Sequence, residues 1–220
     1  RGDYGRQIYE LVEKLRPQAE AAGGKIVSLL GNHEVMNLLG DLRYVSKGDV
    51  KQFGGVATRQ KAWAQGGWLR TALQAHYQAA ALEQGTVFVH AGLLADVAER
   101  WHTPQKLTTA VWEAIDEGRK QDPLLKSEGP VWTRTLAKGN KQKACAEVAD
   151  VLRLWNASRI VVGHTVQRRG VETRCSGRLV MADTGISEHY GGRASAVELV
   201  DGELSAVYPA EGKRKKLEVT

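Results

Sequence analysis

Four polar side chains stand at the ends of short apolar runs of the chain. Asn32 and His33 end the stretch IVSLLGNH, His90 ends VFVH, and His164 ends IVVGH. Asn32, His90 and His164 offer one carboxamide oxygen and two imidazole nitrogens, a neutral donor set that suits manganese, iron or zinc. These residue types therefore predict a metal site, provided that the fold brings the three runs together.

His33 is not expected to bind the same ion as Asn32, because the side chains of neighbouring residues diverge. It would still lie close enough to donate a proton to a leaving group. Glu34 comes next, and we expect it to begin a helix, where a negative charge near the N-terminus is favoured. An ordinary structural role stays open for each residue, since polar side chains at buried strand ends are usually hydrogen-bonded.

Arg1 and Arg134 are the arginines that we select as candidate contacts to a phosphate group. A guanidinium group matches a phosphate through two parallel hydrogen bonds. The sequence alone equally allows both arginines to be surface residues.

The elements that must position these side chains alternate between strands and helices. Apolar runs predict strands at Lys25–Leu30, Thr86–Val89 and Arg159–Val162, and later in RLVMADTG and SAVELVDGELSAVYP, the last with a hairpin turn at Asp201–Gly202. Helices are predicted over 5–22, 104–120 and 141–155, with a helical insert around 41–84. This alternation predicts an α/β fold in which ligands gather at strand ends, so that Asp183 could join the same pocket.

Length, composition and charge narrow the class of protein. The 220 residues are 42% hydrophobic, which predicts a single domain over 1–220 with a real core. Lys and Arg outnumber Asp and Glu by 31 to 25, which favours anionic substrates, and we expect no nucleic-acid partner. Part of this excess is Lys213–Lys216, which we assign to a solvated basic tail over 212–220.

The two cysteines and the apolar runs bear on the environment of the chain. Cys145 and Cys175 lack the paired spacing of a zinc site or of a disulfide framework, so we expect free thiols and leave the compartment open. No apolar run reaches the length of about 18 residues that a membrane span needs. We therefore expect a soluble protein without a membrane span.

The first residues of the chain suggest a fragment. The sequence opens on Arg1-Gly2-Asp3, without an initiator methionine, and leads at once into a helical pattern. We expect that the first strand and helix units of the fold precede residue 1.

Several motifs, taken in order, resemble the phosphoprotein phosphatases, which are calcineurin-like metallophosphoesterases. The chain contains GNHE at Gly31–Glu34, VHAGL at Val89–Leu93 and VVGHT at Val161–Thr165. GPVWTR at Gly129–Arg134 resembles an element typical of the Shewanella-like branch of this family. The resemblance extends over nearly the whole chain and implies a β-sandwich flanked by helices.

The resemblance also implies a role for each candidate residue. Asn32, His90 and His164 resemble ligands of the second of two divalent metal ions, which would be Mn, Fe or Zn. His33 resembles the histidine that protonates the leaving group, and Arg1 and Arg134 resemble phosphate-binding arginines. The implied reaction is hydrolysis of a phosphomonoester by in-line attack of a metal-bridging hydroxide, most often on a phosphorylated serine, threonine or tyrosine of a protein.

Two family motifs, GDxHG and the aspartates of GDxxDRG, are absent from this chain. They would supply the ligands of the first metal ion and the carboxylate that bridges both ions. We therefore expect these 220 residues to bind the metal pair poorly and a longer parent to be the active species.

Two alternatives to a protein phosphatase stay open. ADTG at Ala182–Gly185 is similar to an element of enzymes that hydrolyse dinucleoside polyphosphates. A pseudophosphatase that binds phosphate or protein without turnover would share the same motifs. Assays on a phosphopeptide and on a dinucleoside polyphosphate separate the two enzymatic hypotheses.

Overall fold

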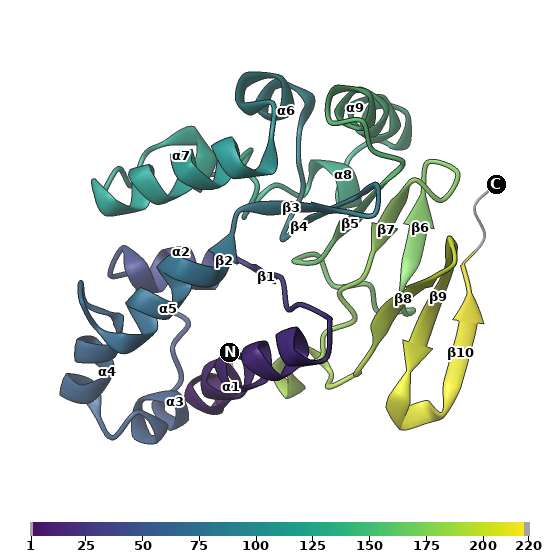
Figure 1. The fold of residues 1–220 in the computed structure, drawn as a ribbon. Coiled ribbons are helices and arrows are strands. Elements are labelled where there is room, and N and C mark those ends of the chain that lie inside the picture. Colours follow the sequence, from purple (N-terminus) through teal and green to yellow (C-terminus); the bar gives the residue numbers. More distant parts are fainter. Residues whose placement is uncertain (1, 218–220) are drawn as a thin grey trace.

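The computed structural model describes residues 2–217, which form a mixed α/β fold (Figure 1). Its α-helices are α1 (Gly5–Ala21), α2 (Asn32–Leu38), α3 (Lys47–Gln52), α4 (Val56–Trp63), α5 (Trp68–His76), α6 (Ala95–Trp101), α7 (Pro104–Asp116), α8 (Thr135–Lys138) and α9 (Lys141–Leu154). Short 3-10 helices are η1 (Pro123–Leu125), η2 (Glu188–Tyr190) and η3 (Pro209–Glu211). The strands are β1 (Ser28–Leu29), β2 (Tyr77–Gln78), β3 (Ala80–Glu83), β4 (Thr86–Val89), β5 (Arg159–Val162), β6 (Glu172–Arg174), β7 (Leu179–Met181), β8 (Ala196–Val200), β9 (Glu203–Tyr208) and β10 (Lys213–Lys216).

A five-stranded sheet with the strand order β3-β4-β5-β7-β6 lies at the centre of the molecule. Its three inner strands, β4, β5 and β7, run parallel, whereas the edge strands β3 and β6 pair antiparallel. Val89 pairs with Val162, and Val162 pairs with Met181, so these strands end at one level. The residues that follow them therefore meet at one edge of the sheet.

The two faces of this sheet bury different partners because side chains alternate along each strand. Val87, Val89, Ile160 and Val162 belong to the main core, together with α7 and α9. Val161 and its neighbours Phe88 and Val180 face the other way and pack against Leu204, Ala206 and Tyr208 of the sheet β10-β9-β8. Each fully buried aliphatic side chain of these layers contributes about 1.5–3 kcal/mol. Helices therefore cover one face of the central sheet, and a second sheet covers the other.

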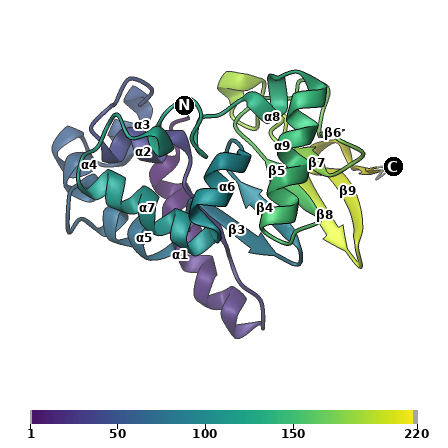
Figure 2. The ribbon, with the colours of Figure 1, turned by 90° about the horizontal axis from the view of Figure 1, so that it is seen from above.

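The helices α2–α5 lie at the opposite end of the molecule from β8–β10 (Figures 1 and 2). The helical insert expected around 41–84 is correct for its helices but wrong at its C-terminal end. The helical part ends at His76, and residues 77–83 contain β2 and the edge strand β3. Ala79, Ala80 and Ala81 are at most 2% exposed, so these small residues let the edge strand lie under α7.

The strand expected at Lys25–Leu30 is shorter than predicted. β1 contains only Ser28 and Leu29, which pair in parallel with Tyr77 and Gln78 of β2. The helix expected over 104–120 ends early, at Asp116, whereas the other expected strands and helices fall at or close to their predicted places, with Thr86–Val89 and Arg159–Val162 matching residue for residue. The hairpin turn at Asp201–Gly202 joins β8 to β9 as predicted.

The basic run near the C-terminus is a strand rather than a tail. Lys213–Lys216 forms β10, which pairs antiparallel with β9 from Lys213↔Tyr208 to Lys216↔Ser205. Leu217 is 5% exposed and packs in the core beside this sheet. The expectation of a tail is wrong up to residue 217 because the backbone is paired, although the four basic side chains do face solvent.

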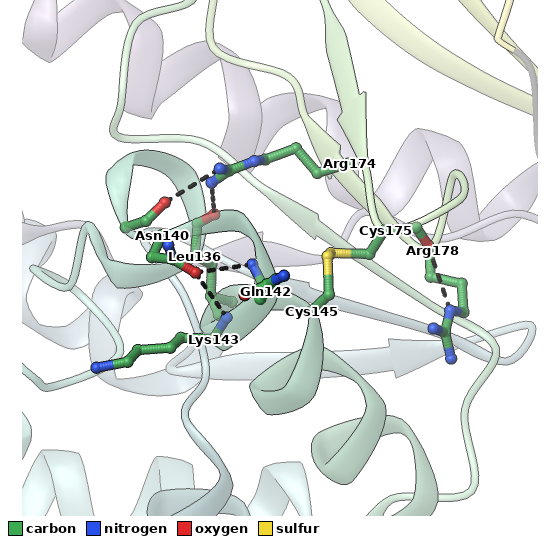
Figure 3. The surroundings of a disulfide bond; sticks show 9 residues. Leu136, Asn140, Gln142, Lys143, Cys145, Arg174, Cys175 and Arg178 are labelled. Atoms are coloured by element: carbon green, nitrogen blue, oxygen red, sulfur yellow. Dashed lines mark hydrogen bonds between the residues drawn. A yellow bond between two sulfur atoms is a disulfide. The ribbon is translucent and has the colours of Figure 1, made fainter.

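The expectation of free thiols is also wrong. Cys145 of α9 and Cys175, directly after β6, form a disulfide with a Cα–Cα distance of 5.2 Å (Figure 3). Arg174, beside it, donates to the carbonyl oxygens of Leu136 at 2.7 Å and Gly139 at 3.0 Å. The sequence separation of 30 residues concealed this pairing, since only the packing of α9 beside β6 brings the two cysteines together.

No helix within residues 2–217 is both long enough and apolar enough to span a bilayer.

Candidate metal centre

The three predicted metal ligands converge on one point of the described structure. Nε2 of His90 lies 2.9 Å from Oδ1 of Asn32 and 3.2 Å from Nδ1 of His164. Nδ1 of His164 also lies 3.2 Å from Oδ1 of Asn32, although the two residues are 132 positions apart. Ligands held about 2.1 Å from one metal ion are separated by about 3.0–3.4 Å, so the spacing of these atoms fits a shared cation.

Hydrogen bonds alone cannot satisfy this triangle of atoms. The Asn32 oxygen only accepts, and each imidazole nitrogen either donates one hydrogen or accepts. If both nitrogens donate to the oxygen, two N–H groups face each other across 3.2 Å. If one nitrogen accepts, its lone pair faces the lone pairs of the oxygen. A cation between the three atoms removes this conflict, and the donor set therefore fits a divalent metal ion.

The two histidines are held in the neutral form that a metal ligand requires. Burial lowers the pKa of His90 to about 4, with His33 and Arg134 adding positive charge nearby. Burial and the neighbouring His90 lower the pKa of His164 to about 3. At neutral pH both rings keep a lone pair for coordination, so no proton must leave before a metal binds.

Strand register and a docked loop position the two histidines. His90 follows β4, and its carbonyl oxygen accepts from the Gly163 N–H at 2.8 Å, which links the ends of β4 and β5. The GPVWTR loop docks on the same edge, where the Pro130 carbonyl accepts from the Ala91 N–H at 2.9 Å. The ring of Trp132 packs edge-on against His164, with 5.8 Å between centroids.

His164 has an unusual backbone conformation. Its φ angle is +60°, in the left-handed region that few residues other than glycine adopt, although asparagine, aspartate and histidine are enriched there. Such a conformation costs of the order of 1–3 kcal/mol and persists where the surrounding structure imposes it. Here it directs Nδ1 toward Asn32 and His90.

The GNHE segment places Asn32 at the start of α2, as expected. Glu34 caps the N-terminus of α2, because its Oε2 accepts a hydrogen bond from the Gly31 N–H at 2.9 Å. Its Oε1 accepts a hydrogen bond from the Tyr9 hydroxyl at 2.6 Å. A Cβ atom on Gly31 would lie 2.7 Å from Glu34 Oε2 and 3.0 Å from the His90 ring. A side chain here would therefore displace Glu34 or the His90 ring, and Glu34 has a structural role. Burial, with Glu34 as the next cause, holds the pKa of Tyr9 well above its usual value.

His33 lines a cleft of about 830 Å³ beside the converging donors. Its ring stacks on Tyr44, with 5.3 Å between centroids. Its carbonyl oxygen accepts from Nδ2 of Asn37 at 2.7 Å, and Oδ1 of Asn37 accepts from Arg59 at 2.7 Å. Arg59 is itself paired with Asp49 at 2.9 Å, so α3 and α4 support the helix turn that carries His33.

The structure brings Arg134 to the site, whereas Asp183 has a local role. Nη1 of Arg134 donates to the His164 carbonyl at 3.2 Å and to Oγ1 of Thr165 at 3.1 Å. The carboxylate of Asp183 accepts from the Gly185 N–H at 2.8 Å and closes a turn. Arg1 lies outside the described residues.

Several residues that shape the site were not found from the sequence. Tyr9, Asn37, Arg59 and Trp132 act through long-range contacts that no local pattern reveals. Within residues 2–217, no group of three or more His, Cys, Asp or Glu residues forms a metal site, because one candidate ligand is an asparagine. The strand-end position of Asn32 was the signal that identified it.

Comparison with known proteins places the chain in a family. An uncharacterised protein of Schizosaccharomyces pombe is 32% identical over 227 residues, which cover 99% of this chain and 68% of that protein. Shewanella-like protein phosphatase 2 of Arabidopsis thaliana is 27% identical, covering 86% of this chain and 60% of that protein. No protein-family model matches the chain.

A solved structure shows the same fold. The cold-active protein-tyrosine phosphatase of a psychrophilic Shewanella species superposes with a TM-score of 0.79 at 24% identity, over 96% of this chain and 64% of that one. The chain is thus shorter than its relatives, spanning less than two thirds of both named phosphatases. Its fold is therefore that of a solved phosphatase. The chain belongs to the Shewanella-like phosphatase family.

Proposed function

We propose that this chain carries the catalytic centre of a metal-dependent phosphomonoester hydrolase that acts on phosphorylated serine, threonine or tyrosine of proteins. The proposal rests on one observation, which is that the side-chain donor atoms of Asn32, His90 and His164 lie within 3.2 Å of one another. The names of two relatives, a Shewanella-like protein phosphatase and a protein-tyrosine phosphatase, support the substrate class.

In this proposal, Asn32, His90 and His164 hold one of two divalent ions, of manganese, iron or zinc. The bound ions would supply Lewis-acid stabilisation of the phosphoryl oxygens and activation of the attacking water. The neutral imidazoles of His90 and His164 make the site ready to bind at neutral pH. The ligands of the other ion are not assigned to described residues of this chain.

His33 is the proposed proton donor to the leaving alkoxide or phenoxide. It lines the cleft and directly follows Asn32 in the chain, and both observations support a position near the proposed metal site. The Asn37 side chain and the Tyr44 ring hold the backbone and ring of His33. Arg134 is the proposed phosphate contact because its guanidinium group is exposed and already anchored beside His164.

The test measures metal binding and hydrolysis separately. Titration calorimetry with Mn²⁺ should give a site on this chain that Asn32→Ala abolishes. Hydrolysis of phosphoserine, phosphotyrosine and dinucleoside tetraphosphate substrates should be compared for this chain and for a longer form that carries the upstream sequence. Faster hydrolysis of the dinucleotide would assign the alternative enzyme class. Metal and phosphate binding without turnover in both forms would assign a pseudophosphatase.

A further inference from the structure

A second cleft, of about 370 Å³, lies between α2 and the loop around η1. Its floor is apolar and comes from three sequence segments: Val35, Met36, Leu39, Leu125 and Trp132. Lys120 and Lys126 stand at its rim with Arg43. Apart from Trp132, which packs against His164, none of these residues has a role in the proposed metal site.

This second cleft adjoins the candidate active site. Met36 lines both clefts and follows His33 by three residues, about one turn of α2 or 5 Å along its axis. Trp132, in the floor of the second cleft, packs edge-on against His164. An extended peptide advances about 3.3 Å per residue, so a residue two to four positions from a bound phosphoresidue would reach the second cleft.

The rim of the second cleft carries surplus positive charge. Among the lining residues of this cleft, Asp41 supplies the carboxylate. It is paired with Arg43, whose Nη2 lies 2.6 Å from Oδ2 of Asp41. In the part of the chain that the structure describes, no carboxylate lies in ion-pair contact with Lys120 or Lys126. Both lysines are exposed and available to an acidic ligand.

The first cleft has the opposite charge. Its lining includes Asp3, Glu34, Asp49 and Glu188, against the single buried arginine Arg59 that is paired with Asp49. In the metal-free protein an acidic segment is therefore favoured at the second cleft over the first. The charge of the two clefts sets the side of the active site on which acidic residues bind.

We propose that the second cleft binds the segment of a protein substrate that flanks its phosphorylated residue, with an apolar side chain on the floor and an adjacent carboxylate at Lys120 and Lys126. This inference rests on the proposed phosphatase function. It names the substrates as phosphoproteins with an apolar and acidic sequence two to four residues from the phosphate.

The test uses two fluorescent phosphoserine peptides in metal-free buffer with EDTA, so that binding is measured without turnover. One peptide carries Leu and Glu at positions three and four from the phosphoserine, and the other carries Ala and Gln there. We expect anisotropy to give at least tenfold tighter binding of the first peptide. Lys120→Glu/Lys126→Glu should remove this preference, and raising the salt concentration should weaken it.

The matched control is Lys14→Glu/Lys106→Glu, which makes the same charge change at exposed lysines outside the cleft and should keep the preference within twofold. Equal affinity for both peptides, or a preference that survives Lys120→Glu/Lys126→Glu, overturns the proposal. Displacement of the peptide by dinucleoside tetraphosphate at lower concentration than by unlabelled peptide also overturns it, because the occupant would then be a nucleotide. Absence of hydrolysis in every assay would refute the proposed function. The peptide-binding result could still be interpreted, because it does not depend on turnover.

Discussion

Arg59 and Asp49 form a buried ion pair, with Nε of Arg59 2.9 Å from Oδ2 of Asp49 and side chains that are 8% and 10% exposed. The guanidinium group also lies over the rings of Phe53 and Trp63, 5.4 and 5.3 Å from their centroids. Its remaining contact, to Asn37, connects the pair to the backbone of His33. The pair therefore links the fold of α3 and α4 to the position of the proposed proton donor.

Removing Arg59 should strongly destabilise the protein. Arg59→Met leaves the Asp49 carboxylate buried without its partner, which costs about 3–5 kcal/mol of unfolding free energy. Asp49→Leu/Arg59→Met removes both charges and should recover much of this loss. Urea denaturation measures the free energies, and Arg153→Met, which breaks an exposed pair with Asp150, should change them by about 1 kcal/mol or less. Equal effects at the two sites would contradict the assignment of a buried pair.

Loss of the disulfide should also lower stability. Cys145 and Cys175 close a loop of 30 residues, and opening such a loop in the unfolded chain costs about 3–4 kcal/mol of stability. We expect the oxidised protein to show no reactive thiols when unfolded and to lose this stability in reductant. Cys145→Ala/Cys175→Ala should be insensitive to reductant. Two titratable thiols in the unfolded, unreduced protein would refute the bond.

The stability of the metal-free protein should fall in mild acid. Burial lowers the pKa of His90 to about 4 and of His164 to about 3, whereas an unfolded histidine titrates at about 6.5. Between these values the unfolded chain binds more protons than the folded chain, so stability decreases as the pH falls from about 6.5 to 4. Chemical denaturation in EDTA across this range measures the slope. His90→Gln/His164→Gln should flatten it, and an unchanged slope in that variant would show that other groups dominate.

His33→Gln should separate proton donation from metal binding. An alkyl phosphate has a poor leaving group that needs a proton, whereas p-nitrophenolate leaves without one. In the form of the protein that hydrolyses phosphate esters, we expect kcat for a phosphoserine peptide to fall by about 10²–10⁴-fold and kcat for p-nitrophenyl phosphate to fall much less. Calorimetry should give the same Mn²⁺ affinity as the parent. Loss of the metal in this variant would make His33 a ligand.

The convergence of these three side chains could be predicted from the sequence because its signal is local. Asn32, His90 and His164 each end an apolar strand or follow one closely, and parallel strands that end at one level bring such residues together. The register of β4 against β5 brings His90 and His164 together, whereas Asn32 follows β1, which pairs with β2 in a separate sheet.

The features that the sequence did not reveal depend on long-range packing. Cys145 and Cys175 become neighbours only when α9 lies beside β6. The burial of Arg59 follows from its contacts with Asp49, ten residues earlier, and with the rings of Phe53 and Trp63. The left-handed backbone of His164 was likewise not predictable, because only a small fraction of histidines adopt it, although histidine is enriched there among residues other than glycine.

The strand β10 also has a consequence for how copies of the chain meet. It occupies the outer position of the sheet β10-β9-β8, where unpaired backbone groups could accept a strand from another molecule. Its four exposed residues, Lys213, Arg214, Lys215 and Lys216, place long charged side chains along this edge, and three of them pair with Glu211, Glu198 and Glu203. A strand from another copy would have to displace or desolvate these charges, so this basic sequence protects the open sheet against edge-to-edge aggregation at high protein concentration.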